Sequence, residues 1–190
     1  MWRLCDVRKG RTGVRVLSRY LAIVFVVAAA AVCSAQTVQV TPLAKDGRVL
    51  VTLRMSDVFT DDVRAAMHSG LRITFVYDIE LKRSTALWVD RTLATATVTA
   101  TIEYDNLTQR YLATRREDGR MVSSQNLERE DAARAWLTEF EKLPLFSSAA
   151  LEGNSEYYLR VRAHTIPRNA SFVWPWEGGI NGLAKFTFLR

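Results

Sequence analysis

The sequence predicts a mainly β protein: an antiparallel, β-sandwich-like domain of about seven strands, with one short and one longer α-helix packed against them. Three observations lead to this prediction. Several segments alternate apolar and polar residues with the period of two that half-buried strands require. Two other segments carry apolar residues at helical spacing. The 190 residues, of which 48% are hydrophobic and 24% charged, exclude a collagen-like, low-complexity or wholly disordered chain.

Residues 1–35 have the organisation of a signal peptide. Six basic residues and one acid are followed by an apolar run over residues 21–33 and by the small residues Ser34 and Ala35. Signal peptidases cleave after small residues of this kind, so we expect cleavage between Ala35 and Gln36. The run is shorter than the roughly 20 residues that cross a bilayer as a helix. An uncleaved N-terminal helix that tethers the protein to the membrane remains the alternative.

Residues 36–190 are expected to form a single exported, β-rich domain, periplasmic or secreted after cleavage. Both cysteines, Cys5 and Cys33, precede it, so the mature domain is expected to have no disulfide and no thiolate metal site. A chain of about 155 residues buries roughly two-thirds of its unfolded surface, which is enough for a hydrophobic core without crosslinks.

The net charge of +6 belongs mostly to the leader. Residues 1–35 account for +5 of it, which leaves 20 basic and 19 acidic residues in the mature domain. Proteins that bind nucleic acid concentrate basic charge in the folded domain, because phosphate neutralisation supplies much of the affinity. Nucleic acid is therefore excluded as a partner.

Alternating patterns place the strands. Residues 71–81 give the clearest one, with six apolar residues on one face and polar residues, among them Asp78 and Glu80, on the other. Residues 92–104 alternate alanine, valine and isoleucine with a row of threonines that suits the solvated side of a sheet. Further strands are expected at 37–42, 48–55, 109–116, 156–165 and 183–189. Turn residues at 45–47 and 105–106 connect neighbouring strands.

Two helices are expected to interrupt the strands. Thr60 caps a short one that runs to His68, with two acids in its first turn and Gly70 available to end it. The longer one is expected from about Asn126 to Leu143, because its apolar residues share one stripe and Pro144 follows.

No catalytic or metal-binding set is visible in the mature domain. It has two histidines, His68 and His164, and neither belongs to a zinc-binding motif; a nucleophile-elbow serine and a glycine-rich phosphate loop are absent as well. We expect no cofactor, no metal and no enzymatic activity. Asp57, Asp61 and Asp62 lie around a helix start, where acids are favourable, although they could also hold calcium. The alternative function is a carboxylate-based envelope hydrolase that uses Asp57 with Asp62.

Two segments are candidate binding surfaces. Tyr158, Arg160, Arg162 and His164 share one face of an expected strand. They could meet an anionic partner or pair with Asp78 and Glu80 on a neighbouring strand, and the second interpretation is favoured. Trp174 and Trp176 flank a proline beside two glycines. Tryptophans in such a loop are typical of interface hot spots, although packing of both rings against the end of the sandwich is favoured.

Several features together resemble the bacterial envelope family known as domain of unknown function 4390. The most specific is the stretch from Tyr104 to Tyr111, Tyr-Asp-Asn-Leu-Thr-Gln-Arg-Tyr. The others are Gly70-Leu71 opening a strand, Trp88, a helix ending at Leu143-Pro144, the Tyr158-x-Arg160-x-Arg162 pattern and the Trp174/Trp176 pair. The resemblance covers nearly all of residues 36–190. It implies a small exported protein of Gram-negative-type bacteria, and it supplies no catalytic residues.

The sequence thus predicts a non-enzymatic, exported envelope domain with a partner-binding or structural accessory role. An envelope protein or a membrane surface is the expected partner, through Tyr158, Arg160, Arg162, His164 and the tryptophan pair. The oligomeric state stays open.

Overall fold

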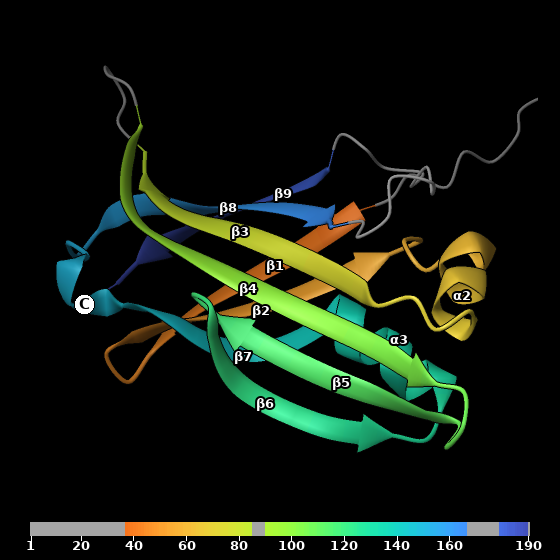
Figure 1. Cartoon of the computed structure of the whole chain (residues 1–190). Helices are drawn as coiled ribbons and strands as arrows, with labels where there is room; N and C mark the ends of the chain where they lie inside the picture. The colour runs from red at the N-terminus through yellow and green to blue at the C-terminus, as the bar shows by residue number, and fades with distance from the viewer. Residues whose placement is uncertain (1–36, 85–89, 167–178, 190) are drawn as a thin grey trace, which may run out of the picture. The chain divides into compact units, whose positions relative to one another are not determined.

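The computed structural model describes residues 37–84, 90–166 and 179–189, which form nine β-strands, two α-helices and one short 3-10 helix, η1 (Ser148–Ala150) (Figure 1). All strand pairings in these residues are antiparallel. The predicted class, a mainly β, sandwich-like fold with two helices, is confirmed. The sequence analysis expected about seven strands, and the two additional ones lie between residues 120 and 147.

The small sheet has the strand order β1–β2–β7. Its strands are β1 (Thr37–Lys45), β2 (Arg48–Ser56) and β7 (Glu139–Ser147). The turn between β1 and β2 uses Asp46 and Gly47 with φ of 51° and 74°, the left-handed conformation that these residue types tolerate best. The turn predicted at residues 45–47 is therefore confirmed.

The large sheet has the order β6–β5–β4–β3–β8–β9. Its strands are β3 (Ile73–Arg83), β4 (Arg91–Asp105), β5 (Arg110–Glu117), β6 (Arg120–Leu127), β8 (Ser155–Thr165) and β9 (Ile180–Phe188). Its two central strands, β3 and β4, are long and run side by side through the sheet (Figure 1).

Both sheets and both helices contribute to one hydrophobic core. The alternation predicted for β3 holds, because Ile73, Phe75, Tyr77, Ile79 and Leu81 are all buried. In β4 the small apolar residues face inward and the threonines outward, as the period of two requires. The small sheet adds three fully buried residues of β2, which are Val49, Val51 and Leu53.

Helix α2 (Asp61–His68) forms as the sequence predicts. The hydroxyl of Thr60 accepts a hydrogen bond from the backbone N–H of Val63 at 3.4 Å. Gly70, with φ of 81°, ends the helix and returns the chain to the large sheet. The helix buries Val63, Ala66 and Met67.

The longer helix predicted over residues 126–143 is wrong at both ends. Helix α3 spans only Glu130–Thr138, residues up to Leu127 belong to β6, and β7 begins at Glu139. The apolar residues beyond the helix point inward with a strand's geometry, since Phe140 pairs with Leu53 of β2 and is fully buried. Pro144 lies within β7, which is the terminal strand of the small sheet and tolerates a missing N–H.

The end of α3 is fixed by two side chains of the large sheet. The Tyr77 hydroxyl donates a hydrogen bond of 2.5 Å to the carbonyl oxygen of Leu137. The Arg115 guanidinium donates to the carbonyl oxygens of Trp136 and Glu139, at 3.0 and 2.8 Å. Its central carbon also lies 4.0 Å from the centre of the Trp136 ring. A cation is favourable at the carbonyl end of a helix, so these contacts determine where α3 stops.

Strands β1 and β9 approach closely at Gly182. A Cβ atom placed on Gly182 would lie 2.8 Å from the carbonyl oxygen of Val38 and 2.9 Å from the Cγ2 atom of Val40. Only glycine leaves room for the backbone of β1 at this point. Gly182 is therefore the position at which the small sheet meets the large one along the β1–β9 side.

Candidate functional site

The first candidate site is the row of Tyr158, Arg160, Arg162 and His164 on β8, called the β8 row below. These residues occupy alternate positions and lie on the outer face of the large sheet, because the residues between them are buried. The register places Arg160 directly opposite Glu80 and Arg162 directly opposite Asp78 on β3. The geometry needed for cross-strand ion pairs is therefore present.

The two acids nevertheless contact other groups. Asp78 lies 3.6 Å from the Nδ1 atom of His164 and accepts a 3.2 Å hydrogen bond from the Thr97 hydroxyl. Glu80 lies 3.0 Å from the Nζ atom of Lys82.

Among the residues that the structure describes, no acid lies within ion-pair distance of Arg160 or Arg162, and both side chains are exposed. The favoured interpretation, that these arginines pair across strands, is therefore not supported by the side-chain positions. Within the described ranges, the two guanidinium groups therefore have no acidic partner.

Tyr158 ends the row as a fixed hydrogen-bond donor. Its hydroxyl donates to the Oδ2 atom of Asp90 at 2.6 Å. This hydrogen bond raises the pKa of Tyr158 to about 12, so the phenol is neutral at physiological pH. The side chain therefore contributes no charge to the row.

Strand β9 extends the same surface. Lys185 lies opposite Tyr158, and Leu183 lies opposite Arg160 with 59% of its surface exposed. An apolar side chain thus lies beside the arginines. Gly179, with φ of 71°, precedes β9 and leaves room for Arg162, whose Nε atom would lie 3.4 Å from a Cβ at that position. Trp174 and Trp176 lie outside the described residues.

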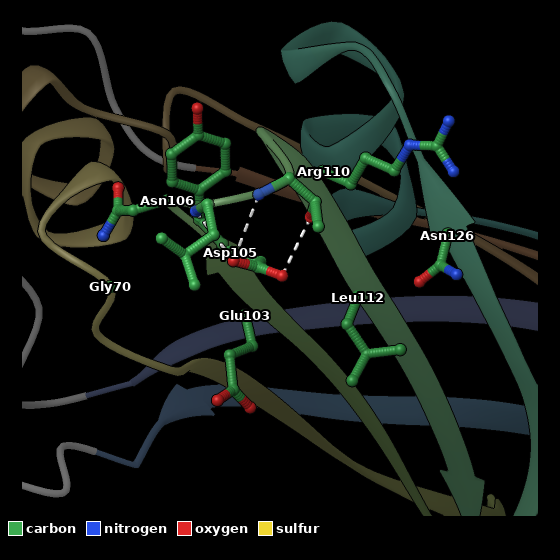
Figure 2. Close-up of a pocket in the computed structure, with 10 residues that line it drawn as sticks. Gly70, Glu103, Asp105, Asn106, Arg110, Leu112 and Asn126 are labelled. Carbon is green, nitrogen blue, oxygen red and sulfur yellow. Dashed lines mark hydrogen bonds between the residues drawn. The ribbon is translucent and has the colours of Figure 1, made fainter.

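A second candidate site is an open cavity of about 900 Å³ at the turn between β4 and β5 (Figure 2). Glu103 and Asp105 come from β4, Arg110 and Leu112 from β5, and Asn126 from β6. Leu107, at the tip of the turn, also lines the cavity, and 96% of its surface is exposed. Leu107 was not among the candidate site residues that the sequence predicts. The available signal was a leucine in a turn whose other residues are polar.

The carboxylate of Asp105 organises that turn. It accepts hydrogen bonds from the backbone N–H of Leu107 at 2.8 Å and of Thr108 at 3.3 Å, and from the Thr108 hydroxyl at 2.8 Å. The bond from Leu107 contributes most to lowering the pKa of Asp105, followed by those from Thr108, because they favour the ionised form. Figure 2 shows Asp105 at the centre of these contacts, with Asn106 on the side of Gly70.

Beside the turn, His68 connects the two helices. Its Nε2 atom lies 3.2 Å from Glu130 of α3, and its ring packs edge-on against Tyr104 with the ring centres 5.0 Å apart. Arg64 donates a 2.5 Å hydrogen bond to the same glutamate. Arg64 first, and His68 after it, lowers the pKa of Glu130. The sequence places His68 at the end of the short helix, and it does not predict the contact with a second helix.

The acids considered for hydrolysis are exposed. Asp57, Asp61 and Asp62 are all on the surface, and Asp61 accepts a 2.8 Å hydrogen bond from Arg64. None of the three lines a cavity described above. Their positions give no support to the hydrolase alternative. In the described residues no group of three or more histidine or acidic side chains is gathered as a metal site would require.

Comparison with known proteins gives one match. The family model described as domain of unknown function (DUF4390) matches residues 33–166. No curated protein and no solved structure matches the chain. Across the described ranges, neither α-helix has the length and apolar character needed to span a bilayer.

Proposed function

The chain belongs to the family of the domain of unknown function DUF4390, and from that premise we propose that it is a non-enzymatic, exported domain that binds an anionic partner in the cell envelope. The binding surface is the outer face of β8 and β9. The partner is an acidic envelope protein or an anionic membrane surface. The leader at residues 1–35 directs export, and cleavage after Ala35 releases the domain.

The observation that supports this proposal is the state of Arg160 and Arg162. Both have an acid opposite them in the register, yet neither forms an ion pair with a described residue, and both are exposed. Leu183, which lies opposite Arg160 on β9, adds exposed apolar surface beside the arginines. Arginines beside an apolar side chain combine electrostatic steering with desolvation, which is the composition that protein interfaces favour.

Reversing both charges is expected to abolish binding. An Arg160→Glu/Arg162→Glu variant should lose at least about tenfold of its association with the envelope, because like charges would then face each other. Two probes separate the partner classes: sedimentation with phosphatidylglycerol vesicles, and chemical crosslinking to proteins of the host envelope. Association of the original chain should also weaken at high salt.

The matched control is Arg48→Glu/Arg120→Glu, which changes the net charge equally at two exposed positions outside the β8 row. This control should bind as the original chain does. Equal loss in both variants would mean that net charge alone governs association, and unchanged binding in both would contradict the proposed surface.

Export has a direct measurement. Mass spectrometry of the protein purified from its host should give a mature chain that begins at Gln36, one residue before β1 starts. A signal peptidase requires a small residue before the cleaved bond, so Ala35→Arg should leave the leader attached. A native chain that retains residues 1–35 would instead support the membrane tether.

A further inference from the structure

Leu107 is the most exposed large hydrophobic residue in the described part of the chain, at 96% of its surface. It stands at the tip of the turn between β4 and β5, where polar residues and glycine are usual. Removing apolar surface from water is favourable, so a leucine held in this position leaves a favourable contact unused. Leu107 is not part of the hydrophobic core. At the base of the turn, Tyr104 and Tyr111 pack together with their ring centres 4.8 Å apart.

The turn holds Leu107 in a defined place. Asp105 accepts three hydrogen bonds from Leu107 and Thr108, and Gln109 adopts the left-handed conformation with φ of 54°. An apolar side chain on an ordered turn loses little further entropy when a partner covers it. These features describe a preformed anchor, which is the type of residue that dominates protein–protein interfaces.

Apart from the ionised carboxylate of Asp105, the charges around Leu107 are paired within the domain. Arg72 donates a 2.8 Å hydrogen bond to Glu103, and Arg110 lies 3.4 Å from Glu128. The surroundings therefore carry one net negative charge, that of Asp105, whereas the arginines of the β8 row have no acid within ion-pair distance among the described residues. Leu112, which is 44% exposed, also lines the cavity and provides a second apolar contact.

The acidic border selects the kind of partner, because the carboxylate of Asp105 disfavours contact with an anionic bilayer surface. Association with a bilayer surface takes a broad apolar face with a basic border, whereas the turn offers one leucine bordered by Asp105 and two internal ion pairs. An apolar pocket in a folded protein accepts such a single side chain. The cavity between the turn and β6 can receive a segment of that protein against Leu112.

We propose that the turn between β4 and β5 docks Leu107 into an apolar pocket of a second protein. This surface is separate from the β8 row, because β3 and β4 lie between β5 and β8 in the sheet. It does not depend on the proposed anionic contact. The two surfaces are distinguished by salt, which screens charge pairs and leaves apolar burial in place.

The test places the photo-crosslinking amino acid p-benzoylphenylalanine at Asn126, which lines the cavity, in the full chain expressed in its host. A protein adduct of defined mass is expected. Leu107→Asp should lower its yield at least tenfold, and Leu107→Met should restore it. The yield in host extract should be the same at low and high salt.

The matched control is Leu189→Asp, at a leucine of the described residues that is 75% exposed and distant in sequence from the turn. It should leave the adduct unchanged, and all variants should keep the melting temperature of the original chain. Absence of a protein adduct, an adduct with lipid, or a yield that is independent of Leu107 would each overturn the proposal. The protein in the adduct is then purified, and its affinity should fall at least tenfold with Leu107→Asp.

Discussion

Gly182→Val is expected to cost the domain about 3 kcal/mol of unfolding free energy, the upper end of the 1–3 kcal/mol that overpacking typically costs, because a backbone atom occupies the space. The Cβ atom would lie 2.8 Å from the carbonyl oxygen of Val38, and backbone cannot rotate away as a side chain can. The strain must be relieved by separating β1 from β9. Urea denaturation followed by tryptophan fluorescence measures the loss.

The control for Gly182 is Thr187→Val in the same strand. Thr187 is exposed, so its replacement should change stability by less than about 0.5 kcal/mol. Gly182→Ala is expected to fall between the two. If Gly182→Val were as stable as the original chain, β1 would not lie against β9, and the junction between the sheets would be different from the one described.

Arg115→Leu is expected to destabilise the domain by about 1.5–3 kcal/mol, since that is what hydrogen bonds to charged groups contribute and the bond to Trp136 is partly buried. The leucine would preserve much of the packing against Trp136 and Phe140. It would leave the carbonyl oxygens of Trp136 and Glu139 without the donor that they have now. The readouts are the denaturation midpoint and the near-ultraviolet circular dichroism of the aromatic side chains, to which Trp136 contributes.

The sign of the Arg115 effect follows from two opposing contributions. Burial lowers the pKa of the guanidinium, and its Nε atom lacks a hydrogen-bond partner, so the side chain carries a desolvation cost. The two carbonyl contacts and the aromatic rings offset this cost. Arg116→Leu, at the exposed neighbouring residue, should be nearly neutral. A stable Arg115→Leu variant would show that desolvation outweighs the contacts.

The local pattern of residues was sufficient to predict β3 and β4, at the centre of the large sheet, and helix α2. When one face of a strand is buried, the period of two in β3 and β4 fixes which residues face the core. Thr60 caps α2 through a contact with a residue three positions along the chain, so this helix start is also visible in the sequence. The same reasoning failed at residues 126–143. There the apolar residues fit a helix equally well, and only the pairing of Phe140 with Leu53 in β2 shows that a strand begins at Glu139.

At the candidate sites, too, the sequence predicted which residues share a face but not which side chains contact each other. The sequence placed Arg160 and Arg162 on one face and proposed Asp78 and Glu80 opposite them, and the register agrees. It could not show that Lys82 and Thr97 hold those acids, because such choices depend on distances between strands. The sequence also did not predict that the Leu107 side chain is exposed.

By itself the sequence determined the fold class, the faces of the main strands and the first helix, because each depends on spacing along a few residues; the leader at residues 1–35 stays a prediction. The tertiary structure alone decided where α3 ends, why Gly182 must be glycine, and which arginines have no ion pair with a described residue. These features arise from contacts between residues far apart in the chain. Such contacts exist only once the strands are brought together, and their energies depend on atomic distances that composition and period do not contain.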